Sequence, residues 1–164
     1  MNILITSDAH DNWENMKKAV RIAEEQRCEH ILFAGDFICP VGLDCFVDFA
    51  GHVHMVWGNN EGEKLGFTTS IAAVKNITHY GDVMDTTIDG VRIYMNHYPG
   101  IVENAALSGK YDIAIFGHTH EYHEERGANG TLLVNPGEIE GHRTGTASVM
   151  LFDTTTRTIK RIDV

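Results

Sequence analysis

Three short apolar segments in the first third of the chain, with helical patterns between them, constrain the fold more than any other feature. NILIT (2–6), HILFAG (30–35) and HMVWG (54–58) have the length and apolar character of buried strands. A helical pattern of apolar residues fills each of the two gaps. Because parallel strands need a crossover of a dozen or more residues, this order predicts a parallel sheet with right-handed connections.

The two intervening helices differ in the signals that predict them. Asp11 and Glu14 form a capping-box pattern at the start of the first helix. The apolar residues that follow are at helical spacing and are expected to face the sheet: Met16, Ala19, Val20 and Ala23. The segment VGLDCFVDFA (41–50) is predicted to form the second amphipathic helix.

The second half of the chain is richer in strand patterns. An Asp-Gly turn between two apolar runs predicts a hairpin over 86–96, and a closing hairpin is expected from 147–153 and 158–164. A short helix is expected at 101–108, and strands at DIAIF (112–116) and TLLVNPG (131–137). Without repeats or a linker, residues 1–164 are expected to form one α/β domain with two sheets and helices outside them.

The net charge limits the kinds of molecule that this protein is expected to bind. The 164 residues carry a formal net charge of −10 with only 13 lysines and arginines, which argues against stable nucleic-acid binding. An anionic substrate would need a cation in the site, which a bound metal could supply. The sequence has no apolar run of bilayer length and no signal-peptide pattern at its start. No membrane association and a cytoplasmic location are therefore expected.

Metal-compatible side chains follow five of the predicted strands, at the point where each strand ends. Any one of these residues could be an ordinary cap, turn or buried histidine. In open α/β sheets, however, ligands bind beyond the carboxyl ends of the strands, so the joint pattern predicts a site there. The candidate residues are Asp8, His10, Asp36, Asn59, Asn60, His97, His118 and His120.

The segment FGHTHEYH (116–123) holds three of the ten histidines. His118 and His120 flank one threonine, so in an extended chain both imidazoles would point to the same face. Together the strand-end residues supply two carboxylates, three or four imidazoles and an amide. That is too many donors for one tetrahedral zinc and suits two divalent first-row ions of higher coordination number. Mn²⁺ is the expected ion, and Ni²⁺, Fe²⁺, Co²⁺ and Zn²⁺ are also admissible.

The order DxH, GD, GN, a lone His and GHTH resembles the calcineurin-like metallophosphoesterases, in particular their small archaeal and bacterial phosphodiesterase branch. The resemblance covers essentially the whole chain and includes GNNEGE (58–63) and NPGE (135–138). It implies an α/β fold: a four-layer αββα sandwich of two mixed sheets flanked by helices, with a dinuclear metal centre at the carboxyl ends of the strands.

The resemblance also implies roles for the candidate residues. Asp8, His10 and His120 would bind the first metal, and Asn59, His97 and His118 would bind the second. Asp36 would bridge the two metals. The residues implied to be catalytic are Asp36, Asn59, Asn60 and His97.

The implied activity is hydrolysis of a small phosphodiester by a hydroxide that bridges the metals. Two alternatives stay open: a phosphomonoesterase of the same fold, and a non-catalytic scaffold, because a trafficking subunit uses this sandwich with partly lost ligands. All seven ligand positions carry competent donors here, which favours the enzyme. A homo-oligomer also stays open.

The sequence departs from the family pattern at several positions. Many relatives place an acid histidine where this chain has Asn60, and an amide has no proton to transfer near neutral pH. Asp11 and Tyr98 stand where glycine is usual, and Tyr98 would narrow the pocket. His142 and Arg143 could assist the substrate or belong to a solvated loop.

Overall fold

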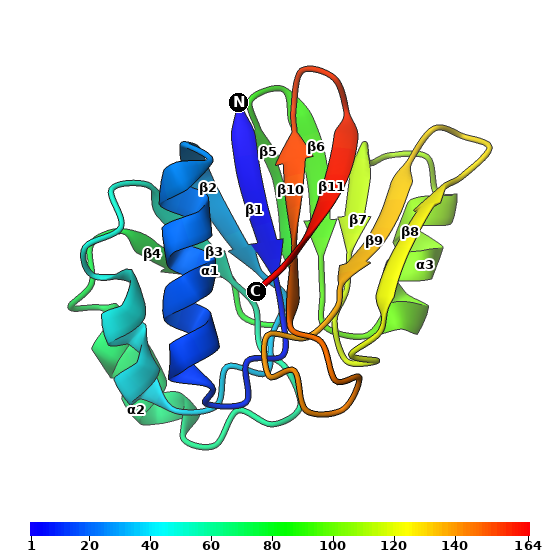
Figure 1. The fold of residues 1–164 in the computed structure, drawn as a ribbon. Helices are drawn as coiled ribbons and strands as arrows, with labels where there is room; N and C mark the ends of the chain where they lie inside the picture. Colours follow the sequence, from blue (N-terminus) through cyan, green and yellow to red (C-terminus); the bar gives the residue numbers. More distant parts are fainter.

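The computed structural model describes residues 1–164 as two β-sheets that pack face to face (Figure 1). The strand order of sheet A is β11-β10-β1-β2-β3-β4. Strands β1 to β3 run parallel, as the sequence predicts, and β4 continues the parallel arrangement. Strand β10 pairs antiparallel with β1 and β11. The strands of sheet A are β1 (Asn2–Thr6), β2 (Cys28–Phe33), β3 (His52–Met55), β4 (Ile77–His79), β10 (Ser148–Asp153) and β11 (Thr158–Asp163).

Sheet B has the order β5-β6-β7-β9-β8 and is also mixed. The predicted hairpin forms its first edge, and β6, β7 and β9 run parallel to one another. The strands of sheet B are β5 (Met84–Ile88), β6 (Val91–Met95), β7 (Ile113–Ile115), β8 (Tyr122–Arg126) and β9 (Leu132–Pro136).

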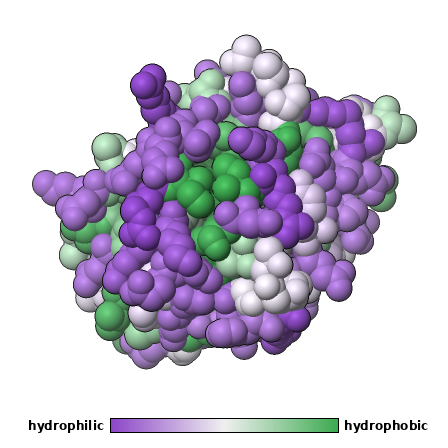
Figure 2. Space-filling model, in the orientation of Figure 1, coloured by the Kyte–Doolittle hydropathy of each residue, from purple (hydrophilic) through white to green (hydrophobic).

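Helices cover the outer faces of both sheets and complete the expected four-layer αββα sandwich. Helices α1 (Trp13–Glu25) and α2 (Lys64–Ile71) and the 3-10 helix η1 (Pro40–Phe46) lie outside sheet A, whereas α3 (Pro99–Leu107) lies outside sheet B. Figure 2 shows apolar surface near the middle of the face seen in Figure 1, ringed by hydrophilic residues. None of the helices has the length and apolar character that a membrane crossing requires.

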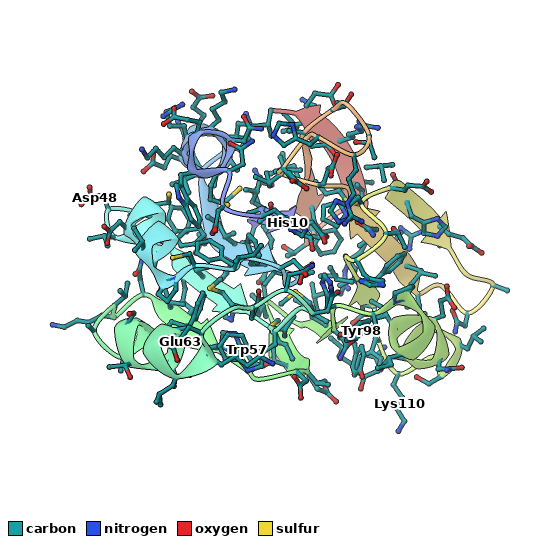
Figure 3. All side chains as sticks on the ribbon, turned by 90° about the horizontal axis from the view of Figure 1, so that it is seen from below. His10, Asp48, Trp57, Glu63, Tyr98 and Lys110 are labelled. Atoms are coloured by element: carbon teal, nitrogen blue, oxygen red, sulfur yellow. The ribbon has the colours of Figure 1, made fainter.

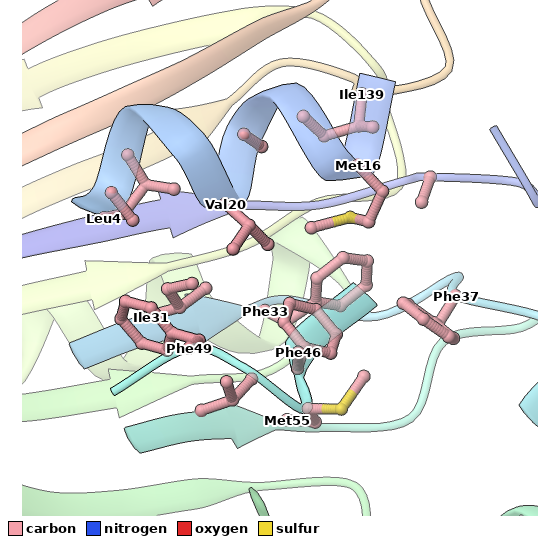
Figure 4. Close-up of a cluster of buried hydrophobic side chains, with 14 of the residues drawn as sticks. Leu4, Met16, Val20, Ile31, Phe33, Phe37, Phe46, Phe49, Met55 and Ile139 are labelled. Carbon is pink, nitrogen blue, oxygen red and sulfur yellow. The ribbon is translucent and has the colours of Figure 1, made fainter. Parts of the chain in front are cut away.

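Two main apolar clusters hold the layers together. One lies between sheet A and its helices, where Met16 of α1 meets Phe33 of β2 and Phe46 of η1 (Figure 4). The other lies between the sheets and joins residues such as Ile5 of β1 and Ile115 of β7. Because both faces of β1 and β2 are covered, each strand contains an uninterrupted apolar run, Ile3 to Ile5 in β1 and Ile31 to Phe33 in β2.

Two predictions about helices were wrong: the N-cap residue of the first helix and the type of the second helix. Asn12, not Asp11, is the N-cap of α1, and its side chain accepts from Asn15 N. The segment predicted as an amphipathic α-helix over 41–50 is instead the 3-10 helix η1, Pro40–Phe46. Its buried residues Leu43 and Phe46 are three apart, which matches the three residues per turn of a 3-10 helix.

Three elements were not predicted from the sequence. Helix α2 contains a glycine and two threonines and buries only Phe67, so its apolar pattern is weak. Strand β4 has three residues. Strand β8 reads YHEER and is an edge strand of sheet B, where charged residues are tolerated and no apolar alternation is needed.

A cluster of three histidines, His30, His52 and His54, lies on strands β2 and β3, on the opposite face of β3 from Val53 and Met55. The Nδ1 atom of His30 lies 3.0 Å from Nε2 of His54, and Nδ1 of His54 lies 2.9 Å from the hydroxyl of Tyr80. Burial lowers the pKa of His54 to about 3, and it also lowers the pKa values of His30 and His52. Folding therefore favours the uncharged form of all three imidazoles.

We predict that this cluster makes the protein acid-sensitive. Because the folded pKa values lie below 6.5, the unfolded chain takes up protons first, and the free energy of unfolding should fall as the pH drops below about 6.5. His54→Leu should cost about 1–3 kcal/mol at pH 8, since hydrogen-bond partners are lost, yet flatten this dependence.

Urea unfolding between pH 8 and 5 in a chelator tests this prediction. The exposed His142 provides a control variant, His142→Asn, which should keep the wild-type slope. An unchanged slope in His54→Leu would contradict the prediction.

Candidate metal centre

The predicted site residues come together at one end of the sandwich, where β1, β2, β3, β6 and β7 end. Figure 3 views the molecule towards this end and shows His10 near its middle. Backbone hydrogen bonds tie the loops to one another. Asp8 N donates to Gly35 O at 3.0 Å, His10 N donates to Asp36 O at 3.2 Å, and Gly117 N donates to His97 O at 3.1 Å. The loops that carry the site side chains therefore stabilise one another through backbone hydrogen bonds.

Asp8, His10 and His120 form one group of donors, with ligand atoms within 4.8 Å of one another. Nε2 of His120 lies 3.4 Å from Oδ1 of Asp8, and Nε2 of His10 lies 3.8 Å from the same oxygen. Asp8 Oδ1 and His10 Nε2 are buried and have no hydrogen-bond partner. Unpartnered polar atoms of this kind are costly, and a cation between them would satisfy both.

Asn59, His97 and His118 form the second group. Oδ1 of Asn59 lies 3.0 Å from His97 Nε2 and 2.8 Å from His118 Nδ1. The Nδ1 atom of His97 lies 2.8 Å from the carbonyl oxygen of Ala34 and donates to it. In a neutral ring the single N–H is therefore on Nδ1, and Nε2 presents a lone pair to Asn59 Oδ1. Two lone pairs that face each other require a proton or a metal ion between them.

Asp36 lies between the two groups. Its Oδ2 atom is 3.4 Å from His10 Nε2 on one side and 3.5 Å from His97 Nε2 on the other. The Asp36 side chain is 1% exposed, so its charge is almost fully removed from water. This is the position that a carboxylate shared by two ions would occupy.

The electrostatics of the site couple Asp36 to its neighbours. Burial alone would raise the pKa of the Asp36 carboxyl, but His97 and the hydrogen bonds from Asn60 lower it overall. Burial alone would lower the pKa of His97, but the neighbouring Asp36 and Asp8 raise it overall. The Asp8 carboxylate raises the pKa of His10, although the 3.8 Å contact is too long for a hydrogen bond. Protons and cations therefore compete for these nitrogens.

The glycines of the GN and GH motifs allow this close assembly. A side chain at Gly58 would collide with the Asp36 carboxylate, and one at Gly117 would collide with Ser7 and Asp8. The motifs thus pair a ligand with a residue that has no side chain, because the neighbouring loop occupies that space.

The backbone at the site is strained, and this corrects one expectation. Five of the predicted ligands have positive φ: Asp8, His10, Asp36, His118 and His120. The chain is therefore not extended at His118 and His120, with φ of 68° and 64°, and the two imidazoles do not share one face. His118 instead points to Asn59, and His120 points to Asp8.

The side chain of Asn60 is hydrogen-bonded to the carboxylate of Asp36. Its Nδ2 donates to Asp36 Oδ2 at 2.7 Å, and its backbone N–H donates to Asp36 Oδ1 at 2.8 Å. In this structure the amide orients the Asp36 carboxylate. His142 and Arg143 lie exposed in the loop after Glu138.

Two glutamates support the site and were not identified as functional from the sequence. Glu61 accepts hydrogen bonds from Asp36 N and Gly58 N through Oε1 and from Ile38 N through Oε2, which joins the loops that carry Asp36 and Asn59. Glu138 is fully buried, and its Oε2 accepts from His120 Nδ1 at 2.6 Å. The GNNE and NPGE motifs contained both residues, but only the fold shows their partners.

Glu138 and Glu140 also form a donor group with His120. The short hydrogen bond to Glu138 occupies Nδ1 of His120, so this group serves to orient the ring. A neutral His120 then carries its proton on Nδ1 and presents its Nε2 lone pair to Asp8. The nitrogen, carboxylate and amide donors of the two other groups, together with the unpartnered Asp8 Oδ1 and His10 Nε2, fit a pair of divalent transition-metal ions.

The sequence pattern of the calcineurin-like phosphoesterase superfamily domain matches residues 1–157. The chain belongs to this superfamily. It is 30% identical to a phosphodiesterase of Methanocaldococcus jannaschii, over 99% of this chain and 98% of that protein.

Solved structures agree with this assignment. A structure of an archaeal phosphodiesterase superposes with a TM-score of 0.93 at 29% identity and covers 100% of both chains. A phosphoesterase from E. coli gives 0.66 at 15% identity over 99% and 98%. Zinc-bound Vps29 from Entamoeba histolytica gives 0.68 at 16% identity over 99% of both chains. The last two share the fold.

We predict that Glu138→Gln weakens metal binding about 10–100-fold, the usual effect of losing an orienting partner. One oxygen of Glu138 accepts from His120, while the other accepts from Thr144 N and Thr144 Oγ1 at 2.7 and 2.9 Å. An amide cannot accept at both ends, so either His120 or Thr144 loses its partner.

Calorimetric titration with Mn²⁺ measures this effect. Glu140→Gln is the matched control, because Glu140 is partly exposed and lies 4.0 Å from His120 Nδ1. Equal losses of affinity in the two variants, or none in Glu138→Gln, would show that Glu138 does not orient a ligand.

Proposed function

We propose that residues 1–164 act as one metallophosphoesterase domain that hydrolyses a small phosphodiester with two divalent transition-metal ions, preferentially Mn²⁺. The observation that carries this proposal is the position of Asp36, whose Oδ2 lies within 3.5 Å of a donor from each of two separate ligand groups. The 30% identical relative is a phosphodiesterase, which supports the same substrate class here.

Each part of the site has a task in this proposal. Asp8, His10 and His120 would hold one ion, Asn59, His97 and His118 would hold the other, and both ions would share Asp36. Two ions held in this way would bind phosphate oxygens and lower the pKa of a water between them. The chain itself carries a net charge of −10, so its residues offer an anion little attraction unless the ions are in place.

Neighbouring residues of the chain orient these ligand side chains. Glu138 and the Ala34 carbonyl group fix the rings of His120 and His97 through their Nδ1 atoms. Asn60 and Glu61 fix the carboxylate and the backbone of Asp36. Hydrogen bonds thus fix the orientation of the ligand side chains before the substrate binds. Such preorganisation favours the reaction because these groups need not rearrange when the substrate arrives.

We expect hydrolysis of bis(p-nitrophenyl) phosphate that is abolished by chelation and restored by Mn²⁺. Asp36→Asn should lower metal occupancy and reduce kcat/KM by several orders of magnitude, because it weakens both ion sites at once. His10→Asn, which removes a ligand from one site, should do less.

Steady-state kinetics and metal analysis of the three proteins test this expectation. Full activity of metal-free wild type would refute metal dependence. Faster hydrolysis of p-nitrophenyl phosphate than of the diester would favour a phosphomonoesterase, and metal binding without turnover of either ester would favour a scaffold.

Because this chain has Asn60 at the position of the acid histidine, we predict that the rate of hydrolysis depends strongly on the pKa of the leaving group. Its amide donates to Asp36 and has no titratable proton, so negative charge must build up on the departing oxygen. The rate should fall steeply as the leaving-group pKa rises. Asn60→His should accelerate poor leaving groups by up to about 10²–10⁴-fold and good ones far less.

A series of aryl phosphodiesters measured on wild type, Asn60→His and the loop variant His142→Asn tests this prediction. His142→Asn should keep the steep wild-type slope. A flat slope in wild type that becomes steep in His142→Asn would show that His142 supplies the proton.

A further inference from the structure

Tyr98 is the exposed aromatic side chain beside the second ligand group. Its ring centroid lies 5.3 Å from that of His97 and 5.2 Å from that of His118. In Figure 3 it lies on the α3 side of His10. Seven large apolar side chains of the chain are exposed, and Tyr98, at 40%, is the one aromatic among them. An exposed aromatic ring against two candidate ligands is a surface on which part of a substrate can lie.

Hydrogen bonds fix the backbone at Tyr98, and the ring packs against the imidazoles of His97 and His118. Tyr98 N donates to the side chain of Asn96 at 2.8 Å, and Pro99 begins α3 directly after it. The Asn96 amide in turn donates to the carbonyl of Asp82 at 2.8 Å. A rigid aromatic side chain loses little conformational entropy when a ligand stacks on it.

The surroundings of Tyr98 are apolar on the side of α3. Ile101 lies three residues further on in the first turn of α3 and is 47% exposed. Tyr98 is the extended N-cap residue of α3, so Ile101 adds exposed apolar surface in the helical turn that follows Tyr98 directly in the chain. The part of a substrate that leaves the phosphate in this direction therefore meets apolar atoms.

We infer that Tyr98 determines specificity by stacking against an aromatic group, aryl or nucleobase, on one ester arm of the substrate. This inference rests on the proposed function, since the phosphate must be held by the adjacent metal centre. Stacking of a base on an aromatic side chain contributes about 1–3 kcal/mol, or roughly 5–150-fold in affinity.

Binding of phenyl phosphate and methyl phosphate to the Mn²⁺-loaded protein, measured by calorimetry, tests the inference without requiring turnover. Wild type should bind phenyl phosphate about 5–150-fold more tightly than methyl phosphate. Tyr98→Leu keeps apolar bulk but removes the π face, and it should lose most of this preference while its methyl phosphate affinity and Mn²⁺ content stay unchanged. Tyr98→Phe should keep the preference.

The outcomes separate this inference from the proposed function. Equal affinities of wild type for the two phosphates, or a preference that survives in Tyr98→Leu, would overturn the role of Tyr98 alone. A loss of Mn²⁺ in Tyr98→Leu would also overturn it, since Tyr98 would then act only by holding His118. Failure of wild type to bind either phosphate would instead refute the phosphate site itself.

Discussion

The buried Asp36 carboxylate, shared between two groups of donors, is the interaction on which the rest of the site depends. A carboxylate at 1% exposure requires positive charge or several hydrogen-bond donors to stay ionised. Asn60 supplies two donors, and His97 and His10 lie on either side. The second buried carboxylate, Asp8, has an oxygen with no partner at all. Two cations would satisfy both acids, and this requirement explains why so acidic a chain gathers histidines here.

The fold meets this requirement because five strands of the two sheets end at the same end of the sandwich. The apolar layers on both faces of β1 and β2 fix the strands, so the loops beyond them can carry strained residues. Gly58 and Gly117 leave room for the neighbouring carboxylates, and Glu61 and Glu138 hold the ligands by their backbone and ring nitrogens. Stability therefore lies in the sheets, and the chemistry lies in loops that these sheets hold rigid.

Much of this arrangement could be predicted because strand ends are easy to locate in the sequence. NILIT and HILFAG each contain a run of consecutive apolar residues typical of a buried parallel strand, and the polar residues that follow two such strands meet at the same end of the sheet. The positions that could not be predicted depend on local geometry or distant contacts. Positive φ at His118 and His120 breaks the alternation of an extended chain, the spacing of Leu43 and Phe46 fits two helix types, and the partner of Glu138 lies 18 residues away.

Anomalous diffraction from crystals loaded with Mn²⁺ tests the central claim most directly, because it locates each ion. We predict two peaks about 3.5–4 Å apart, the separation usual for two-metal sites, with the Asp36 carboxylate bonded to both. One should lie among Asp8, His10 and His120, and the other among Asn59, His97 and His118. A single peak, or an ion bound by Glu138 and Glu140 in place of Asp36, would contradict the shared role of this carboxylate.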